Sequence, residues 1–170
     1  NATFCAKSLA DFVITEAGFA ADLGAEKFMD IKCRLAGIEP SCVVIVATIR
    51  ALKMHGGVKK TDLANPNIDA LKKGFENLKV HIQNIKKFGV PVVVAVNKFI
   101  TDTDEETSLL VDMCKELGSK VCITEGWEKG GLGAETLAKE VASIVENEKS
   151  DFQFLYPLEM PLKEKIETLA

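Results

Sequence analysis

Short apolar runs alternate along the chain with longer segments in which apolar residues recur every three or four positions. Runs of strand length lie at 12–14, 43–47, 92–96, 121–123 and 152–156. The runs 43–47 and 92–96 are continuously apolar and rich in valine, which is typical of strands buried on both faces of a parallel sheet. We therefore expect strands at all five places.

The segments between these runs carry helical patterns. In residues 67–88 one face collects the apolar side chains of Ile68, Leu71, Phe75, Leu78, Ile82 and Ile85. Residues 104–117 open with three acids, which suit a helix N-terminus, and stop before Gly118. Residues 25–33 and 134–146 are predicted as further helices, and 56–66 as an exposed loop.

Strands that alternate with helices in this way predict an α/β fold. We expect a mostly parallel sheet flanked by helices, in a three-layer sandwich similar to that of P-loop NTPases but without their phosphate loop. The length of 170 residues fits a single α/β domain over 1–170.

Composition narrows the class of protein. A hydrophobic share of 47% excludes intrinsic disorder, and the net charge of -4 argues against nucleic acid or an anionic membrane as partner. No apolar run approaches the ~20 residues that span a bilayer, and no signal peptide opens the chain. The cysteines are scattered without a CxxC pair, so we expect reduced thiols, no metal site and a cytoplasmic location. They are Cys5, Cys33, Cys42, Cys114 and Cys122.

Both ends of the chain predict a fragment of a longer protein. The chain has no initiator Met, and Asn1-Ala2 is either native or the scar of a cleaved expression tag. At the other end, Leu162, Ile166 and Leu169 form an amphipathic pattern with no helix stop signal after it.

Ligands of open α/β sheets bind outside the carboxyl ends of the strands. The residues that follow the predicted strands are therefore candidates for a binding site. They are Glu16, Phe19, Asn97, Phe99, Thr124, Glu125 and Trp127.

Each aromatic candidate has two interpretations. Phe19 lies in a turn rich in glycine and alanine, where a small core contact and ligand stacking are equally compatible with the pattern. Trp127 lies in a polar, glycine-rich loop, which favours stacking on a ligand. Arg50 is suited either to a carboxylate or phosphate group or to a buried ion pair. His55 is interpreted as a loop residue.

Two motifs were compared with known nucleotide-binding loops. Residues 126–133 read GWEKGGLG before a predicted helix, but they match neither GxGxxG nor GxxxxGK[ST]. Val96-Asn97-Lys98 resembles the start of NKxD, yet Ile100 stands where the Asp belongs. Guanine recognition is therefore not expected, and a flat ring lying on Phe99 and Trp127 fits better.

Longer stretches carry a more specific resemblance. They are ITEAGFAADLGAEKFMDIKCRLAGIEP (14–40), VATIRALKMHGGV (46–58), FGVPVVVAVNKFITDTDEE (88–106), WEKGGLGAETLA (127–138) and FQFLYPLEMPLKEKIETLA (152–170). In this order they closely resemble formate–tetrahydrofolate ligase, and DLGAEKF and HGGVKKTDLANPN resemble the bacterial single-function form.

The resemblance implies a reaction and its partners. Members of this family join formate to tetrahydrofolate with ATP and Mg²⁺, through formyl phosphate, to give 10-formyltetrahydrofolate. The resemblance places this chain in the middle of a longer, often tetrameric, homo-oligomeric enzyme whose phosphate loop lies outside it. It implies that Phe19, Phe99 and Trp127 line the ligand cleft, and that the last two hold the pterin or the adenine ring. No catalytic residue is assigned.

Two residues depart from the family pattern. Ala20 stands where the family usually has Gly, which would cost about 1 kcal/mol if that position requires a positive φ. Ile100 stands where many members have Pro, which leaves the loop after Phe99 less rigid.

Two other classes of protein stay open at this point. One is a different, degenerate P-loop-like nucleotide-binding module without ligase activity. The missing phosphate loop and the absence of Asp at position 100 count against it. The other is an interaction domain with no chemistry, against which the polar and aromatic residues at the strand ends count.

Overall fold

The computed structural model describes residues 2–170, and its centre is a three-stranded parallel sheet in the order β1-β2-β3. The strands are β1 (Val43–Ala47), β2 (Val92–Asn97) and β3 (Lys120–Thr124). Val43 pairs with Val92, and Val93 pairs with Lys120. The apolar residues of β2 are all buried, as expected for a central strand covered on both faces. The predicted strands at 43–47, 92–96 and 121–123 are thus confirmed, but the expected burial of both faces is wrong for β1, where Val44 and Val46 are exposed.

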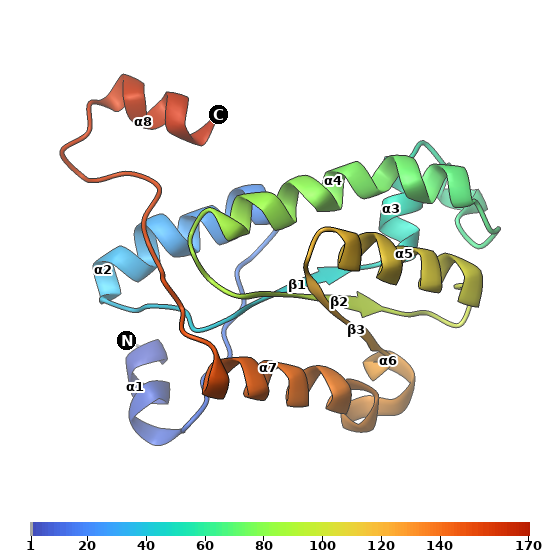
Figure 1. Cartoon of the computed structure of the whole chain (residues 1–170), viewed down its shortest axis with the longest axis horizontal. Coiled ribbons are helices and arrows are strands. Elements are labelled where there is room, and N and C mark those ends of the chain that lie inside the picture. The colour runs from blue at the N-terminus through green and yellow to red at the C-terminus, as the bar shows by residue number, and fades with distance from the viewer. Residues whose placement is uncertain (1) are drawn as a thin grey trace.

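Helices make up most of the remaining chain (Figure 1). In chain order they are α1 (Ala2–Leu9), η1 (Ala21–Ala25), η2 (Phe28–Cys33), α2 (Arg34–Ala36), α3 (Ile49–His55), η3 (Lys60–Asp62), α4 (Ile68–Lys86), α5 (Asp104–Glu116), α6 (Gly126–Lys129), η4 (Gly130–Ala134), α7 (Glu135–Asn147) and α8 (Leu162–Leu169). The four predicted helices are confirmed. The helix predicted at 25–33 is longer than expected, because η1, η2 and α2 form a nearly continuous helical segment over residues 21–36.

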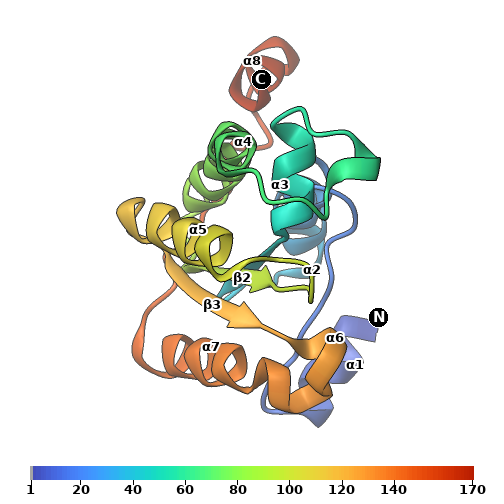
Figure 2. The same cartoon turned by 90° about the vertical axis from the view of Figure 1, so that its right-hand side faces the viewer.

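The helices cover the sheet in two layers. Helices α3, α4 and α5 lie on one face and α7 lies on the other (Figure 2). Leu71, Ile82 and Leu110 pack with Val94 in the larger core cluster, while Ile144 of α7 packs against Val93 on the opposite face. The expected α/β class with a parallel sheet flanked by helices is confirmed, and the likeness to P-loop NTPases stays a prediction.

Two glycines allow α3 and α4 to approach closely. A Cβ on Gly74 of α4 would lie 1.8 Å from the carbonyl oxygen of Leu52 in α3. A Cβ on Gly56, just after α3, would lie 1.9 Å from the carbonyl oxygen of Ala70. Neither position has room for a side chain, so glycine sets the separation of the two helices.

The strands expected at 12–14 and 152–156 are wrong. Residues 12–14 form no regular structure and Ile14 is almost fully exposed, so this segment does not join the sheet of β1, β2 and β3. Residues 152–156 form no strand but pack through Phe152, whose ring lies 6.5 Å from that of Phe88. The aromatic residues of this segment therefore anchor it to the core without a sheet ladder.

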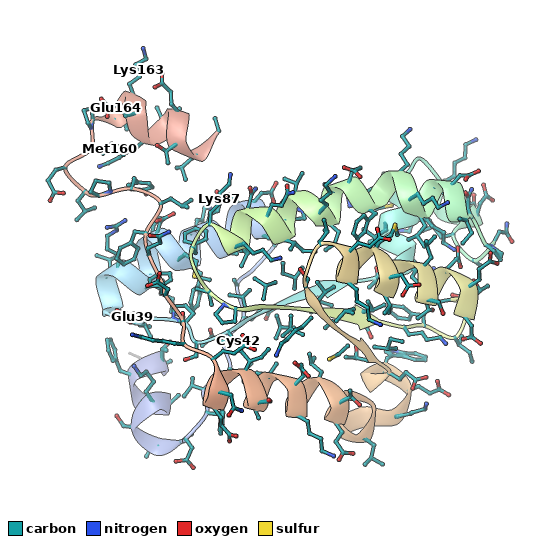
Figure 3. All side chains as sticks on the ribbon, in the orientation of Figure 1. Glu39, Cys42, Lys87, Met160, Lys163 and Glu164 are labelled. Carbon is teal, nitrogen blue, oxygen red and sulfur yellow. The ribbon has the colours of Figure 1, made fainter. Side chains whose placement is uncertain are left out.

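The termini lie at the periphery. Helix α8 has the predicted amphipathic pattern, yet Leu162, Ile166 and Leu169 are all exposed. Figure 3 shows Met160, Lys163 and Glu164 in and before this helix, away from the sheet. At the other end, the predicted tag scar begins at Asn1, which lies outside the described residues.

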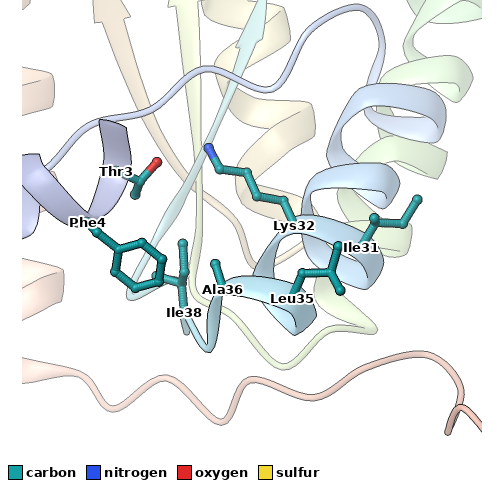
Figure 4. A pocket seen from close by; sticks show the side chains of 7 residues that line it. All are labelled: Thr3, Phe4, Ile31, Lys32, Leu35, Ala36 and Ile38. Atoms are coloured by element: carbon teal, nitrogen blue, oxygen red, sulfur yellow. The ribbon is translucent and has the colours of Figure 1, made fainter. Parts of the chain in front are cut away.

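A shallow hollow lies between α1 and the helical segment 21–36 (Figure 4). Its lining is mostly apolar and consists of Thr3, Phe4, Ile31, Lys32, Leu35, Ala36 and Ile38.

No helix among residues 2–170 has both the length and the apolar character needed to cross a bilayer. The predicted loop 56–66 is mostly exposed, but it contains η3 and buries Leu63.

Candidate functional site

The carboxyl ends of β2 and β3 bring together most of the residues predicted for a site. Asn97 and Thr124 are the last residues of these strands and pair with each other in register. The next residue, Lys98, donates its backbone N–H to the carbonyl oxygen of Thr124 at 2.9 Å. The loops that carry Phe99 and Trp127 therefore begin side by side.

Phe99 and Trp127 are neighbours in the structure. Their ring centroids lie 6.5 Å apart, and their planes meet at 45°. Trp127 is 76% exposed and Phe99 is partly buried. A tilted pair at this separation is a favourable aromatic arrangement, and the exposed indole face remains accessible to a flat molecule.

Arg50 extends the aromatic pair on the side of α3. Its guanidinium carbon lies 5.9 Å from the centre of the Phe99 ring, within the range of a cation–π contact. Arg50 is exposed and forms no ion pair with a carboxylate in the described part of the chain. The alternative of a buried ion pair is thereby excluded.

Phe19 and Glu16 do not lie at a strand end, because the strand predicted before them is absent. Phe19 is 94% exposed and adopts a φ of 65°, the one positive φ of a non-glycine residue in residues 2–170. Ala20 has a φ of -74°, so its departure from the family's glycine carries no left-handed strain. The strained position is Phe19 itself.

The loop after β3 folds back on itself and leaves Trp127 outside. The backbone N–H of Glu125 donates to the carbonyl oxygen of Gly133 at 3.0 Å, and a Cβ on Gly133 would meet the carbonyl oxygen of Glu125 at 2.4 Å. Lys129 pairs with the Glu125 carboxylate at 2.5 Å, and this hydrogen bond raises the pKa of Lys129. These bonds thus fix Glu125 at the start of the loop that carries Trp127.

A buried ion pair lies behind the Phe99 loop, and sequence reasoning missed it. Lys53 of α3 and Glu106 of α5 are 3.0 Å apart, and both side chains are 0% exposed. Glu106 also accepts the backbone N–H of Asn67 at 2.9 Å and caps α5 together with Thr103. The Thr103-x-x-Glu106 spacing signals a capping box at the start of α5, but no sequence signal indicates that Glu106 pairs with Lys53.

The hydrogen bonds to Glu106 determine its ionisation. Burial on its own would raise the pKa of this carboxyl group. The hydrogen bonds from Asn67, Lys53 and Thr103 outweigh burial and hold the pKa below the ordinary value of 4.5. Glu106 is therefore a carboxylate at neutral pH, matched by the ammonium group of Lys53.

Asp102 occupies the turn between Phe99 and α5. Its Oδ2 accepts the backbone N–H of Phe99 at 2.9 Å, and its own N–H donates to the carbonyl oxygen of Phe99 at 2.9 Å. Burial raises the pKa of Asp102 above its ordinary value, although the bond from Phe99 and the nearby charge of Lys53 act in the opposite direction. In the sequence Asp102 falls two residues later than the Asp of an NKxD motif, and that pattern assigned it no role.

The described residues contain no cluster of metal-ligating side chains. Among residues 2–170, no three His, Cys, Asp or Glu side chains gather in the way that metal ligands do.

One comparison decides the family. The model of the family described as formate–tetrahydrofolate ligase matches residues 1–170. The chain belongs to this family. For a formate–tetrahydrofolate ligase, the neighbouring rings of Phe99 and Trp127 at the strand ends are candidates for a substrate-binding site. The match favours the ligase over a different nucleotide-binding module and over an interaction domain without chemistry.

Proposed function

We propose that the chain is the central part of a longer, ATP-dependent ligase that joins formate to tetrahydrofolate through formyl phosphate and yields 10-formyltetrahydrofolate. In this proposal Phe99 and Trp127 bind the flat heterocycle of one substrate, either the pterin or the adenine. The observation that carries the proposal is the pair of rings, 6.5 Å apart at the strand ends of a chain that belongs to the ligase family.

Polar groups around the rings supply hydrogen bonds to the heterocycle. Both pterin and adenine carry an exocyclic amino group, which donates hydrogen bonds. Glu125 and Asn97 bring oxygen acceptors to the loop bases. Thr124 is buried at the end of β3 and its hydroxyl donates to the carbonyl oxygen of Val96 at 3.4 Å, so only its oxygen is left as an acceptor for a ligand. Glu16 and Phe19 are proposed as further contacts on the family motif alone. No residue of this chain is assigned to proton transfer.

The rest of the reaction belongs to other parts of the enzyme. Formation of formyl phosphate requires a cradle for the triphosphate, and residues 1–170 contain no Walker-type loop. We propose that the phosphate loop and the Mg²⁺ ligands lie outside this chain. A homo-oligomeric enzyme that works in the cytoplasm, with formate, tetrahydrofolate and ATP as its partners, completes the proposal.

The test is to remove each ring in the intact ligase. Stacking on an aromatic side chain is worth about 1 to 3 kcal/mol, so Trp127→Ala and Phe99→Ala should each raise one Michaelis constant about ten- to a hundredfold. Phe4→Ala is the matched control, because Phe4 is half-exposed on α1, beside the hollow in Figure 4.

The outcomes separate binding from folding. We expect the KM for either tetrahydrofolate or ATP to rise while the Tm changes little, and the substrate affected identifies the ring that the pair holds. A large loss of Tm with both KM values unchanged would mean that Trp127 serves packing and that the proposed ring site is wrong.

A further inference from the structure

Both backbone polar groups of Phe99 are bonded to a single residue. The carboxylate of Asp102 accepts the N–H of Phe99, and the N–H of Asp102 donates to the carbonyl oxygen of Phe99, both at 2.9 Å. The two residues between them, Ile100 and Thr101, are exposed. The direction in which the Phe99 ring leaves the backbone is therefore set by this reciprocal pair of hydrogen bonds.

Asp102 is buried and lies directly at the start of helix α5. It is only 7% exposed and directly precedes Thr103, the N-cap of α5. Thr103 and Glu106 form a reciprocal capping box, and Glu106 is paired with Lys53. Asp102 is thus joined directly to the hydrogen-bonded start of α5, which fixes the position of its backbone.

One carboxylate oxygen of Asp102 is buried without a hydrogen-bond partner. Oδ2 bonds to Phe99, but the buried Oδ1 has no hydrogen-bond partner in the described part of the chain. Burying a carboxylate at the cost of an unpaired oxygen is unfavourable for folding. A buried carboxylate with an unpaired oxygen, located beside a proposed binding site, indicates that Asp102 has a role in that site.

We propose that Asp102 is the positioning residue of Phe99, and that its carboxylate holds the ring in the orientation that receives the heterocycle. The role rests on the proposed function, since it concerns the same ring site. Asp102 acts through Phe99 and does not touch the substrate. The competing explanation is that Asp102 merely adds an acid near the N-terminus of α5, where negative charge stabilises a helix.

The experiment compares Asp102→Ala with Asp102→Asn in the intact ligase. Ala removes the acceptor for the Phe99 N–H, whereas the amide oxygen of Asn keeps it. One lost hydrogen bond corresponds to about tenfold in affinity, so Asp102→Ala should raise the KM of the ring-bearing substrate about tenfold with little change in kcat. Asp102→Asn should stay close to the wild-type KM. Thr101→Ala is the control in the same loop, because Thr101 is exposed and takes no part in the pair of bonds.

The readouts separate positioning from stability. If both Asp102 variants lower the Tm while KM stays at the wild-type value, or if Asn fails to restore the KM that Ala raises, the positioning role is overturned. Phe99→Ala and Trp127→Ala in the same assay report on the ring site itself. If they raise KM and Asp102→Ala does not, only the positioning role fails. If they leave KM unchanged, the proposed function fails as well.

Discussion

The five cysteines differ widely in how far solvent reaches their thiols. Cys5 on α1 is exposed, Cys42 is partly buried, and Cys33, Cys114 and Cys122 are buried. Burial raises the pKa of Cys33 and of Cys114 to about 11. Because the thiolate is the reactive form, these two side chains are poor nucleophiles at neutral pH.

This difference predicts a stepwise titration with a thiol reagent. At pH 8 the native chain should react quickly at Cys5 and slowly at the buried cysteines, and unfolding in urea should release the remaining thiols. Cys5→Ser is the control and should remove the fast phase. A fast phase that survives in Cys5→Ser would show that the native packing around another cysteine is open. Figure 3 places Cys42 at the start of β1 near α7, where such an opening would be seen first.

Residue-level prediction from the sequence succeeded for exposed chemistry and failed for buried charge. Trp127 could be predicted because a large aromatic in a polar glycine-rich loop has few structural uses. Lys53 and Asp102 could not, because a charged residue in a helix or loop is assigned to solvent unless its partner is known. The partner of Lys53 lies on a different helix, and only the fold brings the two together.

Among the helices, α3 and α5 are joined by the buried Lys53–Glu106 pair. Lys53→Met leaves a buried carboxylate without its cation, which should lower the free energy of unfolding by about 3 to 5 kcal/mol. Lys53→Met combined with Glu106→Gln removes both charges and keeps an acceptor for the N–H of Asn67. The double variant should therefore lose less free energy of unfolding than Lys53→Met alone. Urea unfolding measures both. Equal losses in the single and double variants would show that the charge pair is not the source.

The same pair predicts a pH dependence. The folded pKa of Glu106 lies below its ordinary value of 4.5, so its ionised form stabilises the native state. That contribution is fully present above this value and is lost as pH falls through the folded pKa. The difference in unfolding free energy between wild type and Glu106→Gln should therefore shrink as the pH is lowered below 4.5. A difference that stays constant would contradict the assignment.

The close contact between α3 and α4 predicts an unusual effect of alanine. In most helix interiors Gly→Ala stabilises, but in Gly74→Ala the new Cβ would collide with the carbonyl oxygen of Leu52. Overpacking of this kind costs about 1 to 3 kcal/mol, and thermal unfolding should show a lowered Tm. Gly131→Ala is the control, since its Cβ would meet nothing within 4 Å.

Elements were predictable where local signals and packing agree. Helices α4 and α5 have apolar faces and side-chain caps at Asn67 and Thr103, so their sequences alone define them. The segment 12–14 was mistaken for a strand because three apolar residues resemble one locally. Sheet membership depends on a partner strand, and none lies beside it.

For the molecule as a whole, one face of β1 is left open. Val43 and Ile45 pack towards Ile85 of α4, while Val44 and Val46 alternate to the other face. Val46 is 66% exposed there. An apolar strand face in water is unfavourable, and the described part of the chain covers it only in part, with Val44 37% exposed.

For the whole chain, the prediction concerns its ligase activity. Residues 1–170 contain no phosphate loop, so the chain on its own should form no 10-formyltetrahydrofolate from formate, ATP and tetrahydrofolate. The intact ligase, assayed beside it, is the positive control. Product formation above the blank by the isolated chain would show that the nucleotide phosphates bind within these residues.

The parallel sheet also determines what happens while the chain is being made. The partners in each strand pair are far apart in sequence, since Val43 pairs with Val92 and Val93 with Lys120. Ribosomes add about 5 to 20 residues per second, so β1 emerges seconds before its partner exists. Helix α4 is synthesised in between and can form from local contacts, whereas the valines of β1 must wait. During synthesis, the segment that most needs protection from other nascent chains is therefore the one that later positions Arg50 beside the ring site.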